Sequence, residues 1–215
     1  MAKMKIIACG TLEEEIRNIL PENVDCEFLE VGLHNTPDKL KQELQKRVNE
    51  AVGHDTLLIG YGLCSNGTIG LISNTHTIVI PRVHDCISLL LGSRKQYDKE
   101  FNCFPATFYL STGWIKLKGD PISEYNRYIE KYGEENARWI IHEEYKHYQR
   151  VAFINTVGDS KEEVKYSQEV AKFLNVEFSE IRGTLEYFEK LINGKWDEDF
   201  LIFQPGKLIS ANDFM

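Results

Sequence analysis

The sequence lacks the features that mark membrane, secreted and nucleic-acid-binding proteins. No apolar stretch approaches the roughly 20 residues that cross a bilayer, and the first residues lead into a strand pattern without the apolar core and cleavage site of a signal peptide. No block of Lys and Arg interrupts a composition whose net charge is −8. We therefore expect a cytoplasmic protein that neither enters membranes nor binds nucleic acids generally.

Common catalytic and cofactor motifs are also missing. The glycine-rich stretch 60–70 follows neither the GxGxxG nor the Walker A pattern, no GxSxG elbow is present, and no CxxC pair fixes a metal site. The five cysteines are an odd and widely spread set, which is atypical of a secreted disulfide framework. In a reducing compartment, such cysteines are ligands, nucleophiles or small buried residues.

What the chain does contain is a series of short apolar runs, each bounded by turn residues. Such runs predict buried strands. Helical patterns separate them, which favours a parallel α/β architecture. The predicted strands are 4–9, 26–32, 56–63, 77–81, 107–112, 151–158, 176–181 and 200–206.

The even distribution of these strands predicts two similar Rossmann-like lobes with mainly parallel sheets facing a cleft. Four strands precede Pro105 and four follow it, so residues 1–105 are expected to form one α/β lobe and 106–215 the other. The tetrapeptide Gly-Thr-Leu-Glu opens a predicted helix in both halves, which agrees with a duplication. A single continuous sheet is the alternative.

Capping residues and apolar stripes predict the helices. Thr11 is expected to cap the first helix, and apolar residues at i+4 spacing mark a second over 36–52. One helix is expected to begin near Asn66, and another to be capped by Asp85. The stretch 122–148 is helical, with one glycine at which it would break.

Three cysteines and a histidine follow predicted strands. Cys9 ends the first strand, Cys64 follows the third, and Cys86 follows the fourth. The carboxyl ends of parallel strands line the ligand crevice of an open α/β sheet, and adjacent strands are about 4.8 Å apart. Thiolate and imidazole are favoured ligands of thiophilic metals. The pattern predicts a metal site at Cys9, Cys64, His84 and Cys86. The alternative is that these are ordinary buried core residues.

Residues around the cysteines are candidates for contact with a small anionic ligand or the acidic groups of a cofactor. Backbone amides at a glycine-rich turn bind anions, and an Arg in an apolar setting must pair with an acid or face a cleft. Tight packing of the turn and pairing of the arginines with an acid are the alternatives. The candidates are Gly62, Ser65, Asn66, Gly67, Arg82, Asp85 and Arg94.

The same residues also allow a thiol-dependent enzyme. His84 could activate Cys64 or Cys86 for attack on a small acidic substrate, and the start of a helix would favour the Cys86 thiolate. Whether the chain is an enzyme stays open at this point.

Three segments, GYGLCSNGTIGL at 60–71, IPRVHDCISLLLGSR at 80–94 and FYLSTGW at 108–114, resemble a family of functionally uncharacterised proteins of anaerobic bacteria and methanogenic archaea. Its members are often encoded beside corrinoid-dependent methyltransferases. The resemblance implies an iron–sulfur cluster, a corrinoid or zinc at the Cys/His set, and a corrinoid protein or methyltransferase as partner. We therefore expect an accessory protein of anaerobic methyl-transfer metabolism.

Overall fold

The computed structural model describes residues 3–215 and divides them into two compact units. The first unit runs to Arg94 and resumes at Leu185, and the second comprises Lys95–Thr184. The sequence pattern predicts a single boundary at residue 105, whereas the chain returns to its first unit for the last segment. Within the described residues, no helix is long and apolar enough to cross a membrane.

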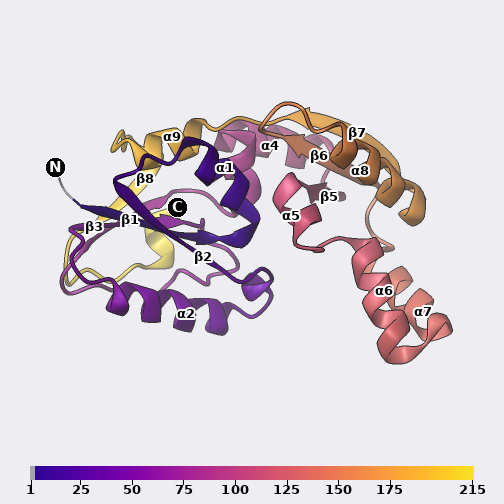
Figure 1. The fold of residues 1–215 in the computed structure, drawn as a ribbon, viewed down its shortest axis with the longest axis horizontal. Coiled ribbons are helices and arrows are strands. Elements are labelled where there is room, and N and C mark those ends of the chain that lie inside the picture. Colours follow the sequence, from indigo (N-terminus) through magenta and orange to yellow (C-terminus); the bar gives the residue numbers. More distant parts are fainter. Residues whose placement is uncertain (1–2) are drawn as a thin grey trace. The chain divides into compact units, whose positions relative to one another are not determined.

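The first unit is built on a five-stranded sheet with the order β2-β1-β3-β4-β8 (Figure 1). The first four are parallel neighbours and the last is antiparallel to β4. All eight predicted strands are present, and the α/β fold class is confirmed. The strands of this sheet are β1 (Met4–Cys9), β2 (Val24–Leu29), β3 (Thr56–Gly60), β4 (Thr77–Pro81) and β8 (Phe200–Phe203).

Strand β8 explains why the boundary differs from the predicted one. Its residues pair with β4, from Ile78 with Phe203 to Pro81 with Phe200. An apolar run predicts a strand but not its partner, so the sequence could not assign β8 to the first sheet.

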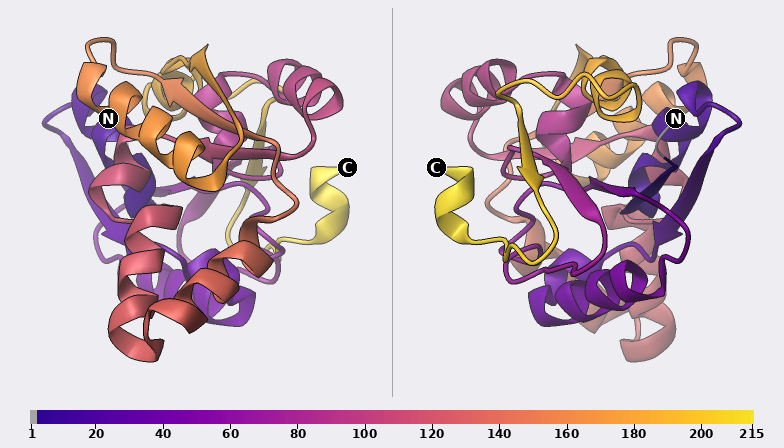
Figure 2. Two further views of the ribbon diagram at one scale, coloured as in Figure 1. Left: turned by 90° about the vertical axis from the view of Figure 1, so that its right-hand side faces the viewer. Right: turned by 90° about the vertical axis from the view of Figure 1, so that its left-hand side faces the viewer.

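Helices cover both faces of the first sheet, which is why β3 and β4 consist of nearly continuous apolar runs. Helices α1 (Glu13–Ile19) and α9 (Glu186–Ile192) lie on one face, and α2 (Pro37–Glu50) runs along the other (Figures 1 and 2). Leu40 and Leu44 of α2 are fully buried, as the i+4 stripe predicts.

The second unit repeats the parallel arrangement on a smaller scale. Its three strands, β5 (Thr107–Leu110), β6 (Arg150–Asn155) and β7 (Glu177–Arg182), are parallel in that order. Helix α8 (Lys161–Leu174) packs against β6 and β7. Trp114 packs against the core of this unit.

The remaining helices of the second unit connect its strands. The predicted helical stretch breaks at Gly133, where φ is +78°, into α6 (Pro121–Tyr132) and α7 (Glu134–Tyr145). Helix α5 (Thr112–Lys116) follows β5 directly and is absent from the sequence-based expectation.

Two local predictions of helix starts are wrong. No helix begins near Asn66, because Cys64, Ser65 and Asn66 adopt positive φ angles that a right-handed helix cannot contain. Thr11 does not cap a helix, because it lies inside the 3-10 turn η1 (Gly10–Leu12) and its hydroxyl donates to the Cys9 sulfur.

The helix predicted from Asp85 is present, but it is interrupted. Gly92, with φ of +81°, ends α3 (Cys86–Leu91), and α4 (Arg94–Cys103) follows.

Candidate functional site

The candidate site lies at the carboxyl ends of the parallel strands of the first unit. Strand β2, which follows β1 in the chain, lies on one side of β1 in the sheet. The chain then crosses back, and β3 lies on the other side of β1. Ligands of open α/β sheets bind at such a reversal of strand order, where the loops diverge and leave a crevice. Cys9 is the last residue of β1, and Cys64 follows β3 by one short turn. The two cysteines therefore lie on opposite sides of this position.

Backbone hydrogen bonds join the turn after β3 to the segment after β4. Leu63 N donates to Val83 O at 2.9 Å, and Cys64 N donates to His84 O at 2.8 Å. The buried Thr68 hydroxyl donates to Gly62 O at 3.1 Å. These bonds hold the loop carrying Cys64 next to the loop carrying Cys86.

The turn itself is strained. Cys64, Ser65 and Asn66 have φ angles of 44°, 56° and 69°. Left-handed backbone costs an L-residue about 1–2 kcal/mol, and non-glycine residues visit it singly rather than in runs. Such strain persists where surrounding structure enforces it, and it clusters at ligand-binding and catalytic sites.

Glycines allow the turn to pack closely. A Cβ on Gly62 would lie 2.5 Å from Val83 O, and one on Gly67 would lie 2.5 Å from a Leu40 methyl carbon. Close packing therefore accounts for both glycines without a ligand. Ser65 and Asn66 are exposed, and anion binding by this turn stays a prediction.

The three predicted cysteines are brought together. Cys9 and Cys64 are buried and Cys86 is partly buried, and the three thiols are close enough to act on one another electrostatically. The pKa of the Cys64 thiol is raised to about 12, mainly by burial and to a smaller extent by the charges of Asp85 and Cys9. Burial is likewise the largest cause of the raised pKa of Cys86, and the charges of Cys64 and Cys9 raise it further. All these neighbours are groups that ionise to anions.

A buried tyrosine completes this cluster. Tyr61 is only 3% exposed, and its hydroxyl is buried with no partner in hydrogen-bond geometry. Burial is the largest cause of its raised pKa. The charges of the Cys9, Cys64 and Cys86 thiols raise the pKa further, and the Cys9 thiol is also near enough to the hydroxyl to act as a hydrogen-bonding group. Sequence reasoning missed Tyr61, although its place between two glycines directly after a strand marked it.

Asp85 lies in the loop after β4 and caps the helix that begins with Cys86. Its Oδ1 accepts from Ile87 N at 3.0 Å and from Ser88 N at 3.2 Å, which confirms the predicted cap of α3. Cys86 is the first residue of that helix. The predicted stabilisation of its thiolate by the helix is nevertheless outweighed, because burial and anionic neighbours raise its pKa.

The chain belongs to a family of proteins of unknown function. A family model described as "Protein of unknown function (DUF1638)" matches residues 28–192, which is most of the chain. The matched segment includes Cys64, His84 and Cys86, and it begins after Cys9. No curated protein and no solved structure matches the chain significantly. The function of this DUF1638 member must therefore be argued from its site.

Two histidines lie on loops at this end of the sheet. The predicted ligand His84 is exposed, and its backbone carbonyl accepts from Cys64. His34, which sequence reasoning missed, lies in the 3-10 turn η2 (Leu33–Asn35) after β2. Burial lowers the pKa of His34 in spite of the opposing charge of Asp85, so its neutral form is favoured. Its position after a strand, like that of Cys64, was the available signal.

The structure places the two predicted arginines beside other groups. The Arg82 backbone N donates to Asp199 O at 2.7 Å. The pKa of Asp213 is lowered mainly by its hydrogen bonds with Ser210, and the charge of Arg82 adds a small effect. Burial and the charge of Asp199 raise the pKa of Tyr187 on α9, and Arg94 lowers it. Neither arginine is among the groups with the largest effects on Cys64 or Cys86.

The donor set fits a thiophilic metal, but its arrangement does not close around one. Three thiols and a nearby imidazole are the chemistry that zinc and iron–sulfur centres use. Among residues 3–215, no three Cys, His, Asp or Glu side chains are arranged closely enough to hold a metal ion. The other two cysteines lie elsewhere. The Cys26 sulfur is 3.8 Å from a guanidinium nitrogen of Arg17, and Cys103 is exposed at the end of α4.

Proposed function

We propose that this DUF1638 protein binds a thiophilic metal ion, or the metal of a cofactor, through Cys9, Cys64 and Cys86. The observation that carries the proposal is the meeting of three thiols and one unpartnered buried phenol at the reversal point of the strand order. A buried hydroxyl without a partner in hydrogen-bond geometry costs stability, so its presence in this cluster favours a role with a ligand.

The electrostatics of the cluster support a cation as that ligand. The thiols, the phenol and Asp85 all become anions on ionisation, and after burial these neighbouring groups contribute to the raised pKa values of Tyr61, Cys64 and Cys86. A metal cation supplies the opposite charge, and a coordinated thiol loses its proton. Binding is therefore expected to release protons.

Relaxation of the strained turn would bring the cysteines closer together around a metal. Cys64 would move toward Cys9 and Cys86 as the left-handed turn 64–66 relaxes, so the stored strain would lower the cost of that movement. The Tyr61 hydroxyl would then donate to a coordinated sulfur. His84 is the proposed fourth ligand if its side chain turns inward, and His34 is the competing candidate.

Within the cell, we place this site in an accessory protein for loading, reducing or maintaining a corrinoid methyl-transfer system. A corrinoid protein or methyltransferase would be its partner. This part of the proposal rests on the resemblance carried by segments 60–71, 80–94 and 108–114.

The thiol-enzyme alternative has weaker support. A cysteine nucleophile needs a depressed pKa and a cationic neighbour. Burial and acidic neighbours raise the pKa of both Cys64 and Cys86, which opposes thiolate formation without a bound cation.

The test is anaerobic purification and reconstitution with iron and sulfide, zinc or cobalamin in separate samples. Elemental analysis and an absorption spectrum would follow. We expect about one centre per chain, with metal content at least fivefold lower in Cys9→Ser, Cys64→Ser and Cys86→Ser. Cys26→Ser and Cys103→Ser are matched controls that should keep the metal.

Tyr61→Phe separates a role in the site from a role in folding. It should keep the metal but shift the sulfur-to-metal absorption band, because one hydrogen bond to sulfur is lost. A metal-free wild-type protein after every reconstitution, or equal metal in all five cysteine variants, would refute the proposal.

A further inference from the structure

The second unit contains a pocket that the cysteine site does not use. It has a volume of about 430 Å³, within the range of small-molecule sites. Helices α6, α7 and α8 supply its walls. The lining residues are Tyr125, Arg138, Ile141, His142, Tyr145, Lys146, Phe173 and Leu174.

The lining is basic on one side. Arg138 and His142 on α7, with Lys146 directly after it, are spaced four residues apart and therefore face the same direction. No acidic side chain is among the residues lining this pocket. That is notable in a chain with 33 Asp and Glu against 25 Lys and Arg.

Acidic residues near the rim pair with two of these bases. Arg138 pairs with Glu134 at 2.6 Å, and Lys146 pairs with Glu143. Both ion pairs are solvent-exposed, and such pairs are weak in water, so a ligand anion can compete for the bases. The pKa of Glu143 is lowered mainly by its hydrogen bond with Lys146, and the charges of His142 and His147 lower it further. The cations around Glu143 therefore stabilise its ionised form.

The other lining residues of the pocket are aromatic or aliphatic. The rings of Tyr125 and Phe173 lie 5.3 Å apart between centroids and are tilted by 48°. Ile141, which is 6% exposed, and Leu174 add aliphatic surface. A flat ring placed here would contact both aromatic side chains while remaining within reach of the basic groups.

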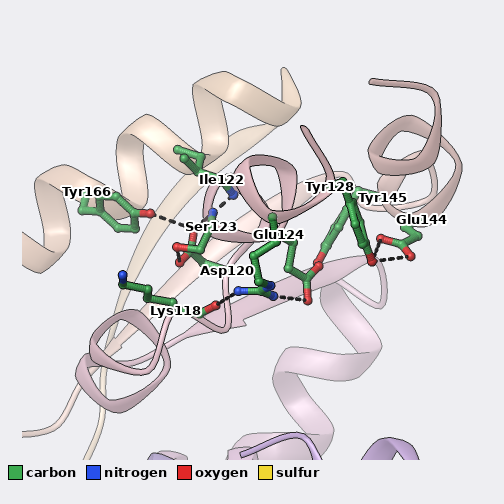
Figure 3. Close-up of polar contacts among 10 residues, drawn as sticks. Lys118, Asp120, Ile122, Ser123, Glu124, Tyr128, Glu144, Tyr145 and Tyr166 are labelled. Atoms are coloured by element: carbon green, nitrogen blue, oxygen red, sulfur yellow. Dashed lines mark hydrogen bonds and ion pairs between the residues drawn. The ribbon is translucent and has the colours of Figure 1, made fainter. Parts of the chain in front are cut away.

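Hydrogen bonds fix the walls of the pocket. Figure 3 shows the Tyr145 hydroxyl directed at Glu124, to which it donates at 2.5 Å. The Tyr128 hydroxyl donates to Glu144 at 3.1 Å, which joins α6 to α7 a second time. The Tyr145 ring also packs edge-on against Phe108 of β5 at 5.4 Å. The pocket is therefore formed before any ligand binds, which limits the entropy lost on binding.

We propose that this pocket binds a small organic anion that carries an aromatic ring. The ring would lie against Tyr125 and Phe173, and the carboxylate or phosphate would be held by Arg138 and Lys146. Basic groups beside aromatic side chains in one pocket recognise this combination, whereas a purely inorganic anion would leave the aromatic and aliphatic lining unused.

The test uses 2-naphthoate as the probe on the full chain. Naphthalene-2-methanol and 2-naphthylmethylamine carry the same rings without the negative charge, and inorganic phosphate carries the charge without the rings. Binding is followed by amide chemical-shift changes in NMR spectra. We expect naphthoate to bind at least about tenfold more tightly than each of the other three, with shifts centred on residues of α7 and the end of α8.

Variants locate the binding. Arg138→Gln with Lys146→Gln should weaken naphthoate binding about tenfold, and Phe173→Leu should weaken it severalfold while keeping apolar volume. Lys131→Gln with Lys165→Gln removes two exposed charges of the same unit outside the pocket and should leave binding unchanged. Equal binding of all probes, phosphate binding as tight as naphthoate, or equal loss in both double variants would overturn the proposal.

Discussion

The turns that follow the central strands of the two parallel sheets are built in opposite ways. After β6, the side chain of Asn155 holds its own turn: its amide nitrogen donates to Gly158 O at 2.9 Å, and Gly158 N donates back to its oxygen at 3.0 Å. After β3, three consecutive non-glycine residues have left-handed backbone, and the Tyr61 hydroxyl is buried without a partner.

This difference separates a structural turn from a candidate site. The Asn155 turn is explained by its own hydrogen bonds, and these use the Gly158 amide that an anion would otherwise need. The turn carrying Cys64 also has hydrogen bonds of its own, from Gly67 N to Cys64 O and from the Thr68 hydroxyl to Gly62 O. It differs in adding three left-handed residues, a thiol with a raised pKa and a buried hydroxyl without a partner in hydrogen-bond geometry. Local rules are broken most often where function requires it.

The largest expected contrast is in thiol reactivity. A pKa of about 12 leaves roughly a thousandfold less thiolate at Cys64 near neutral pH than an ordinary thiol with a pKa near 8.5 has. Iodoacetamide should therefore alkylate Cys64 and Cys86 at least a hundredfold more slowly than the exposed Cys103 of the second unit. Peptide mass spectrometry over time measures each rate. Rapid alkylation of Cys64 or Cys86 at neutral pH would instead favour the thiol enzyme.

The next contrast concerns pH and metal binding. Each thiol that ligates a metal must give up its proton, and the raised pKa of Cys64 means that it still holds this proton at neutral pH. Metal affinity should therefore rise by about tenfold per pH unit for each proton displaced, and fall correspondingly as the pH is lowered. Chelator competition at pH 6.5, 7.5 and 8.5 under anaerobic conditions measures the slope. An affinity that does not change with pH would exclude the buried thiols as ligands.

Sequence patterns predicted what depends on local composition. Apolar runs located every strand, and Asp85 was correctly identified as a cap because one residue and its two amide donors are neighbours in the chain. The strand-end rule also selected Cys9, Cys64 and Cys86, whose thiols are electrostatic neighbours because β1, β3 and β4 are adjacent. Their role as ligands stays a prediction.

What the sequence could not predict depends on contacts between distant segments. Pairing of β8 with β4 decides where the C-terminal segment belongs, and nothing in an apolar tetrapeptide specifies that partner. The turn with positive φ angles at 64–66 begins where Leu63 and Cys64 donate hydrogen bonds to Val83 and His84, which lie about 20 residues further along the chain. His34 joins the site only because β2 lies beside β1.

Alanine at matched glycines tests whether close packing is confined to the first turn. A methyl group on Gly62 would lie 2.5 Å from a backbone oxygen, which cannot move without shifting the strand-end loop. We expect Gly62→Ala to lower the free energy of unfolding by about 3 kcal/mol. Gly158 has open space around its Cβ position but φ of +98°, so Gly158→Ala should cost only about 1 kcal/mol.

Urea unfolding of both glycine variants gives the comparison. Equal losses would mean that backbone conformation, rather than the approach of the two loops, decides both positions. A small loss for Gly62→Ala would show that the loops carrying Cys64 and Cys86 can separate easily.

The smallest expected contrast tests whether strain in the turn serves the site. Ser65 and Lys118 are exposed non-glycine residues with φ of 56° and 54°, one in each unit. Glycine at either position relieves the left-handed cost but adds freedom to the unfolded chain, so each variant should change stability by no more than about 1 kcal/mol. Ser65→Gly should also weaken metal binding severalfold, because it removes strain whose release would favour the movement of Cys64 toward the metal. Lys118→Gly should leave metal affinity unchanged. If both variants keep wild-type affinity, the strain at 64–66 reflects packing against Val83 and Leu40 and has no part in binding.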